Sequence, residues 1–272
     1  MFELMSIRNF LLSGIIFFCA LVLGYIFILD KRSIDDPISY LYFNYGLLGF
    51  FPLIWFFFQL KKQKIASVVY TKGFIQHIPI VLLLIVILFS FSSGTVWLTD
   101  YILSFIIPDY VEESFIEEDL NGMQFLLSAV QSCVIGAAAE EFIFRGLLLK
   151  RLASKTTVLM GTILSSLLFG ILHYDIIGSF VFGFIMSILY LKSGNLLLPI
   201  TIHILYNTAV TILPEFPKFT NITTISDLHT YMIPNLIMLL LSALILTMYI
   251  KRNIKNIFSS EIKIFQNRKS ML

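Results

Sequence analysis

Long uninterrupted runs of apolar residues dominate the chain, and short polar segments separate them. A run of roughly 17–25 apolar residues is long enough to cross the hydrocarbon core of a bilayer as a helix. Helices are expected because every backbone polar group must find a partner inside lipid. The pattern predicts eight membrane spans, at residues 10–29, 38–60, 78–98, 123–149, 156–173, 176–191, 196–213 and 233–250.

The composition supports the same fold class. Hydrophobic residues make up 58% of the 272 residues and charged residues 13%, whereas soluble domains carry roughly 25% charged residues. We therefore expect an all-α, polytopic membrane helix bundle with about eight transmembrane helices. Cys19 and Cys133 lie in apolar runs, where cysteine behaves as a small hydrophobic residue. Neither a disulfide framework nor a cysteine-based metal site is indicated, and the net charge of +2 gives no sign of a nucleic-acid partner.

The basic residues predict the orientation of these spans. Most of the 19 Lys and Arg residues fall on the side that holds the amino terminus, and Lys31, Arg32 and Lys218 fall on the other side. Positively charged loops favour the cytoplasmic side, so both termini are expected in the cytoplasm. The loop between the third and fourth spans is acidic, and the tail after residue 250 is basic. We expect that tail to be solvated or to lie along the cytoplasmic leaflet.

Polar side chains enter the spans only in the second half of the chain. Ionisable residues inside a membrane are costly, so they indicate a functional site by default. Taken singly, a Glu-Arg pair can be a structural clamp, a histidine at a span end an interfacial residue, and an asparagine a link between helices. Their gathering in spans four, five and seven favours a site made of Glu140, Glu141, Arg145, His173, His203 and Asn207.

Helical spacing suggests separate roles for these side chains. Glu141 and Arg145 are four residues apart, with the carboxylate first, so they can pair on one helix face. Glu140 is turned about 100° from Glu141 and has no cation nearby in sequence, which suits a partly desolvated general base. His203 and Asn207 also share one face, where together they can hold a developing oxyanion.

Three motifs in order, Glu-Glu-x-x-x-Arg (Glu140, Glu141, Arg145), Phe-x-x-x-His (Phe169, His173) and His-x-x-x-Asn (His203, Asn207), carry a family resemblance. Together they resemble the signature of the CPBP intramembrane proteases. This family comprises CAAX prenyl endopeptidases and bacteriocin-processing or self-immunity proteins, also called Abi. The resemblance covers roughly residues 120–215, whereas residues 1–110 share only hydropathy with the family. It divides the chain into amino-terminal spans at 1–110, a catalytic core at 120–215, and a last span with its basic tail at 230–272.

The resemblance implies an endopeptidase that hydrolyses a peptide bond of a membrane-associated protein or peptide. Glu140 would act as general base on a water, helped by His173, a role that rests on the resemblance alone. His203 and Asn207 would stabilise the oxyanion, and Glu141, Arg145 and Phe169 would support the site. A zinc ion could use Glu140, His173 and His203 as ligands, but the chain has no H-E-x-x-H sequence, and a metal-free, glutamate-driven reaction is favoured.

The expected depths of these residues in the membrane do not agree with a single shared site. At 1.5 Å per residue, Glu140 and His203 lie well inside the membrane, whereas His173 ends a span and would lie near the opposite face. The site can form only if spans five and six make a displaced hairpin whose turn lines the cavity. We therefore predict that His173 lies within about 10 Å of Glu140.

Two other functions compete with proteolysis. One is a non-catalytic immunity or regulatory scaffold that binds a peptide or partner protein. The other is a transporter, which the absence of paired inverted halves disfavours. The expected surroundings are a lipid bilayer, in a bacterial cell membrane, because the usage of Ile, Phe and Lys is typical of a low-GC bacterium. Peptide maturation, signalling or self-immunity are then the default roles.

Overall fold

The computed structural model describes residues 5–28, 42, 44–62, 78–115, 122–213 and 222–269. Every regular element in these ranges is a helix, and they contain no strand, which confirms the predicted all-α class. The elements follow one another as α1 (Ile7–Ile28), η2 (Asn44–Phe50), α3 (Phe51–Lys62), α4 (Ile78–Leu103), α5 (Pro108–Ser114), α6 (Gly122–Val130), η4 (Gln131–Gly136), α7 (Ala137–Glu141), η5 (Phe142–Leu149), α8 (Lys150–Lys155), α9 (Val158–Ile171), α10 (Ile176–Ser193), α11 (Leu197–Ile212), α12 (Ile225–Thr230) and α13 (Met232–Lys269), where η marks a π-helical segment.

The predicted spans fall on these helices, although not all of the helices are long enough to cross a bilayer alone. Five helical segments have sufficient length and hydropathy: Ile7–Ile26, Val81–Leu103, Gly122–Lys155, Ile176–Ser193 and Met232–Ile254. Three further apolar helices, Tyr45–Lys61, Val158–Ile171 and Leu197–Ile212, are shorter. Most of residues 38–43, where the second span was predicted to begin, lie outside the described residues. The protein is thus an integral, multi-pass membrane protein, and the count of eight crossings stays a prediction.

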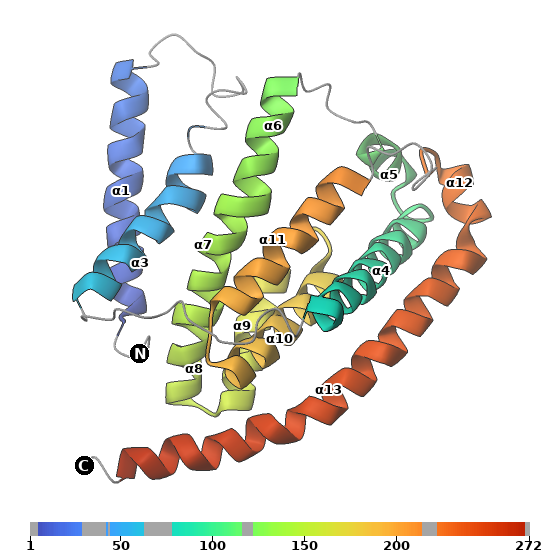
Figure 1. Cartoon of the computed structure of the whole chain (residues 1–272). Coiled ribbons are helices and arrows are strands. Elements are labelled where there is room, and N and C mark those ends of the chain that lie inside the picture. Colours follow the sequence, from blue (N-terminus) through green and yellow to red (C-terminus); the bar gives the residue numbers. More distant parts are fainter. Residues whose placement is uncertain are drawn as a thin grey trace.

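The helices pack around one long rod. Segments α6, η4, α7, η5 and α8 follow one another without interruption (Figure 1). Helices α1 and α3 lie on one flank of this rod, and α9, α10 and α11 pack on the other side, followed by α4 and α13 (Figure 1). The described starts of α1 and ends of α13 lie at the same edge of the molecule. That arrangement suits two termini on one side of the membrane, and the cytoplasmic assignment of that side stays a prediction.

Helices α9 and α10 form a hairpin that is fixed at both of its ends by local sequence. The hydroxyl of Thr157 caps α9 by accepting the backbone N–H of Met160. Asp175 caps α10 in the same way, and α10 ends at Gly194, whose φ of 66° is left-handed. With 14 residues, α9 is about 21 Å long, which is shorter than the ~30 Å hydrocarbon core. A helix of this length that starts at one face of a bilayer would end within the hydrocarbon core, as the displaced hairpin requires.

Two polar segments outside the predicted spans are partly helical. The acidic loop after the third span contains the end of α4 and the short helix α5. The basic tail does not leave the helix at residue 250, because α13 continues to Lys269. The reason lies in the sequence: after Pro234 in its first turn, α13 contains no proline or glycine that would end the helix.

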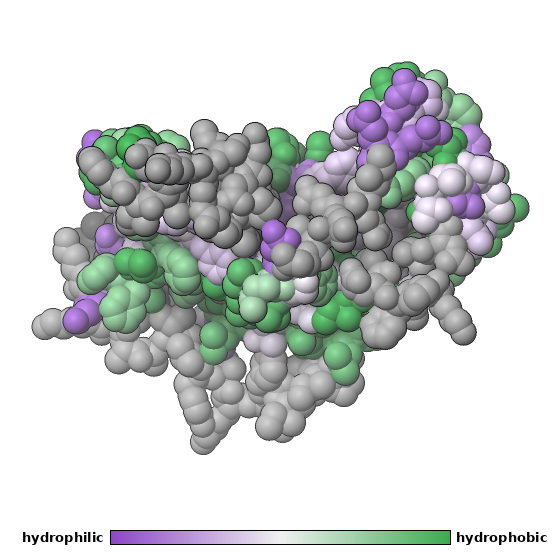
Figure 2. All heavy atoms as spheres, turned by 90° about the horizontal axis from the view of Figure 1, so that it is seen from above, coloured by the Kyte–Doolittle hydropathy of each residue, from purple (hydrophilic) through white to green (hydrophobic). Residues whose placement is uncertain are grey.

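The outer surface is that of a protein surrounded by lipid. Large apolar side chains are exposed along several helices, for example Ile16 on α1, Phe57 on α3 and Leu240 on α13. Figure 2, seen from above, shows several hydrophobic patches among the described residues and the densest group of hydrophilic residues at one corner. Large apolar side chains exposed on this many helices are typical of contact with a membrane.

Close contact between α8 and α9 yields a first testable prediction. A β-carbon on Gly161 would lie 2.6 Å from the backbone nitrogen of Ala153, so Gly161→Ala must push the two helices apart. We expect a loss of about 1–3 kcal/mol in the free energy of unfolding, measured as a lower thermal midpoint in detergent. Gly122→Ala is the matched control, because its β-carbon would meet nothing within 4 Å. Equal midpoints for the two variants would contradict this packing.

Candidate active site

The two glutamates of the first motif lie near the middle of the long rod. The rod from Gly122 to Lys155 has 34 residues and is therefore about 50 Å long. Glu140 and Glu141 end the five-residue α7, which is flanked by the π-helical segments η4 and η5. Single turns of π-helix inside α-helices often mark functional sites. Both carboxylates thus lie deep in the membrane-spanning region.

A buried network of three charged or titratable groups stands next to Glu140. Arg145 Nη1 lies 2.8 Å from Glu141 Oε1, and the two side chains are 1% and 0% exposed. This confirms the predicted pair. His203 Nδ1 is also 2.8 Å from Glu141 Oε1, and since a carboxylate only accepts hydrogen bonds, this nitrogen carries the proton. Glu141 therefore orients His203 as well as neutralising Arg145.

The ring of Phe169 packs against the guanidinium of Arg145 and the imidazoles of His173 and His203. The guanidinium carbon of Arg145 lies 4.7 Å from the centre of the Phe169 ring, within cation–π distance. The same ring is 4.4 Å from the ring of His173 and 5.8 Å, edge-on, from that of His203. Phe169, which is fully buried, thus supports the site by packing, as the family resemblance implies.

Both histidines turn the same ring nitrogen toward Glu140. His173 Nδ1 donates to the backbone carbonyl of Phe169 at 2.7 Å, so its Nε2 is left for another partner. His173 Nε2 lies 3.9 Å from Glu140 Oε2, and His203 Nε2 lies 3.7 Å from the same oxygen. Glu140 Oε2 is buried, and no hydrogen-bond partner for it occurs among the described residues. These separations are too long for direct hydrogen bonds and suit a bridging water.

The predicted proximity of His173 and Glu140 is therefore confirmed. The short helix α9 ends at Ile171, and the turn that follows brings His173 next to Glu140, which lies near the middle of the rod. Glu140 and His173 have similar partial exposure, 33% and 34%, whereas His203 is 3% exposed. The roles of these side chains in a reaction stay a prediction, but the geometry on which those roles depend is present.

The hydrogen bond of Asn207 goes to a backbone group outside this cluster. Asn207 follows His203 by one helical turn on α11, and its amide nitrogen donates to the backbone carbonyl of Ser132 at 3.0 Å. No contact between Asn207 and Glu140 is recorded within the described part of the chain. Since the amide group has two N–H bonds, one remains to donate elsewhere. Its assignment to an oxyanion site stays a prediction.

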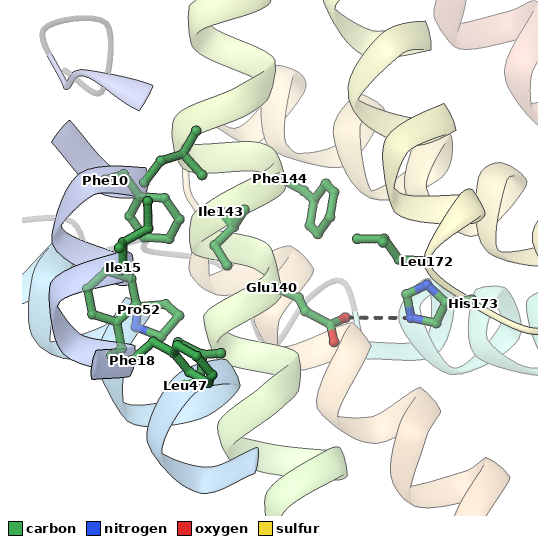
Figure 3. Close-up of a pocket in the computed structure, with 13 residues that line it drawn as sticks. Phe10, Ile15, Phe18, Leu47, Pro52, Glu140, Ile143, Phe144, Leu172 and His173 are labelled. Atoms are coloured by element: carbon green, nitrogen blue, oxygen red, sulfur yellow. Dashed lines mark ion pairs between the residues drawn. The ribbon is translucent and has the colours of Figure 1, made fainter. Parts of the chain in front are cut away.

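A cavity of about 650 Å³ opens beside Glu140 and His173. Figure 3 shows these two side chains pointing toward each other at one end, and Phe10, Ile15 and Phe18 of α1 lying across from them. Apart from Glu140 and His173, the lining is apolar. The sequence did not indicate the α1 wall, because every face of α1 is hydrophobic and hydropathy cannot tell which face meets the cavity.

The candidate metal ligands do not fit a metal site in this geometry. Among the described residues, no three His, Cys, Asp or Glu side chains are arranged to hold a metal ion. Glu140, His173 and His203 are included in that statement.

The fold is that of a multi-pass membrane protein, and part of the chain is similar to a protease family. Residues 122–209 match the sequence model of the type II CAAX prenyl endopeptidase Rce1-like family. This stretch contains all three motifs, so the CPBP-family resemblance drawn from them is confirmed over it.

One curated relative agrees with this family. The Bacillus subtilis (strain 168) protein named "Putative membrane peptidase YdiL" is 32% identical over 94 residues, which cover 34% of this chain and 38% of that protein. The chain thus spans about two-fifths of the length of this relative. No solved structure matches the chain.

The buried charge network predicts a large effect of removing its cation. Arg145→Met would leave Glu141 in the protein interior with only His203 as a partner, and breaking a buried pair costs about 3–5 kcal/mol. We expect a much lower unfolding midpoint in detergent. The double variant Glu141→Gln, Arg145→Met should recover part of the loss, because it leaves no unpaired carboxylate. If Arg145→Met had the same unfolding midpoint as the wild type, the Glu141–Arg145 pair would contribute nothing to stability.

Proposed function

We propose that this protein is an intramembrane endopeptidase in which Glu140 activates a water molecule for attack on a peptide bond. The observation that carries the proposal is the position of Glu140 Oε2, buried and 3.7–3.9 Å from two imidazole nitrogens. A water held among these three atoms can donate one hydrogen bond to the carboxylate and one to His173 Nε2. It is then oriented with its lone pairs toward the cavity.

The proposed reaction uses His203 as an imidazolium. Its Nδ1 donates to the Glu141 carboxylate, and a second proton on Nε2 is available for donation to an oxyanion. His173 Nε2 accepts a hydrogen bond from the water, because its Nδ1 donates to the backbone carbonyl of Phe169.

The reaction follows from these states. Glu140 takes a proton from the water as the oxygen bonds to the carbonyl carbon, and the carbonyl oxygen becomes an oxyanion. His203 Nε2–H and the second N–H of Asn207 stabilise that oxyanion. When the carbon–nitrogen bond breaks, Glu140 returns its proton to the departing amine. The step uses water and side chains of this chain only.

Neutralising Glu140 is the direct test. Glu140→Gln keeps the shape of the side chain but removes the base, so we expect cleavage to fall about 10²–10⁴-fold with normal abundance in the membrane. Comparative proteomics of membrane fractions should show an uncut precursor that accumulates in the variant. Glu113→Gln, an exposed glutamate on α5, is the matched control. Undiminished processing by Glu140→Gln would instead support a non-catalytic immunity or regulatory scaffold.

The cavity supports a substrate with an apolar segment. Its walls come from α1, η2, α3 and η5, and its polar end is formed by Glu140 and His173. A membrane-associated peptide could place apolar side chains in the cavity and its scissile bond at the carboxylate. We place such a substrate, and the protein itself, in a bacterial cell membrane, where peptide maturation, signalling or self-immunity would require this cleavage.

Filling the cavity should weaken substrate binding without touching the catalytic groups. Ile15 lines the cavity, whereas the adjacent Ile16 does not, and both side chains are well exposed, at 60% and 71%. We expect Ile15→Trp to reduce kcat/KM about tenfold, mainly through KM, and Ile16→Trp to have little effect. Both would be measured as the rate at which purified protein cleaves the precursor identified above. If Ile15→Trp and Ile16→Trp cleaved the precursor at the same rate, this cavity would be excluded as the substrate site.

A further inference from the structure

The turn that carries His173 is tied to the middle of α4 by its acidic residue. Asp175 accepts three hydrogen bonds: from Ser92 Oγ at 2.5 Å, from Thr95 Oγ1 at 2.8 Å and from the backbone N–H of Gly178 at 2.9 Å. Two of the three donors belong to α4, which lies outside the family-matched stretch 122–209. The turn's place relative to α4 is thus set by side-chain hydrogen bonds.

A second bond joins the same turn to α4. The hydroxyl of Tyr174 donates to Asp100 Oδ1 at 2.5 Å, and Asp100 is buried. Both residues that follow His173 in the chain are therefore bound to α4.

Depth in the membrane makes these bonds difficult to replace. Ser92 and Thr95 lie near the middle of the Val81–Leu103 span, where water is scarce and an unpaired carboxylate is costly. Leu172 is 74% exposed, and Ile176 and Ile177 are also exposed, so these apolar side chains contribute little packing at the turn. The bonds to α4 therefore fix the turn to a helix outside the hairpin, in addition to the local bonds from His173 N to Gly170 O and from His173 Nδ1 to Phe169 O.

Gly178 shows how tightly the carboxylate of Asp175 is seated. A β-carbon on Gly178 would collide with Asp175 Oδ2 and would lie 2.9 Å from Thr95 Oγ1. Any larger residue would displace the carboxylate from its place between α4 and α10. This glycine thus provides the space that the three hydrogen bonds need.

We propose that Ser92 and Thr95 are positioning residues that act through Asp175 to hold His173 Nε2 toward Glu140 Oε2. The inference rests on the proposed endopeptidase function, in which His173 holds the attacking water. A misplacement of about 1 Å at a reacting group can cost on the order of 100-fold in rate. Loss of the α4 hydroxyls should therefore reduce catalysis even though neither of them touches the substrate.

The first measurement follows the turn itself. A nitroxide spin label is attached at Leu172→Cys, with exposed Cys19 replaced by serine and buried Cys133 retained. Thr95→Val, which has nearly the same shape, and Ser92→Ala should each narrow the spectral lines, because the turn moves more freely. Thr95→Ser should restore the parent spectrum. Thr99→Val is the matched control, since Thr99 Oγ1 donates only to its own helix, at Thr95 O.

The second measurement is the rate at which unlabelled variants cleave the precursor that accumulates in Glu140→Gln. Glu140→Gln is measured in the same assay as the inactive control. We expect Thr95→Val to lower kcat at least about tenfold with KM little changed, and Thr95→Ser to rescue it. Unchanged spectra, or unchanged kcat in Thr95→Val while Glu140→Gln is inactive, would overturn the positioning role and leave the proposed function standing. Full cleavage by Glu140→Gln would instead overturn the proposed function.

Discussion

The buried pair of Glu141 and Arg145 is the constraint on which the rest of the site depends. Neither charge could remain in the interior of a membrane protein without the other, and each of them also binds a neighbouring helix. Glu141 accepts the imidazole proton of His203 on α11, and Arg145 lies over the ring of Phe169 on α9. The pair therefore fixes three helices relative to one another, and Glu140, one residue away, is presented to the cavity as a consequence.

The sequence predicted the parts of this arrangement that follow from local periodicity. Hydropathy located the helices, because a span is a property of one continuous segment. The spacing of four residues predicted the Glu141–Arg145 pair for the same reason. The displaced hairpin was predicted because the motif placed His173 in the site, whereas its position at the end of a span placed it near the opposite membrane face. In the structure the short helix α9 brings the two requirements into agreement.

Contacts between distant segments could not be predicted in this way. The bond between Glu141 and His203 joins residues 62 positions apart, and the bond between Ser92 and Asp175 joins residues 83 positions apart. In a chain where almost every helix face is apolar, no polarity pattern indicates which faces meet. Hydroxyls inside the third span were the available signal for the α4 contacts, but a serine in a membrane helix can equally bond to its own backbone, as Thr99 does.

The titratable groups of the site and the residues that surround and support it come from different parts of the chain. All of the charged and imidazole groups of the site lie within the stretch that matches the protease family, 122–209. The apolar wall opposite Glu140 comes from α1, η2 and α3, and the bonds that hold the His173 turn come from α4. Lipid supplies no hydrogen bonds to a polar site, so these must come from other helices. Under the proposed function, the helices outside the matched stretch would shape the path of the substrate to Glu140 and would hold the His173 turn, although the reacting groups lie within it.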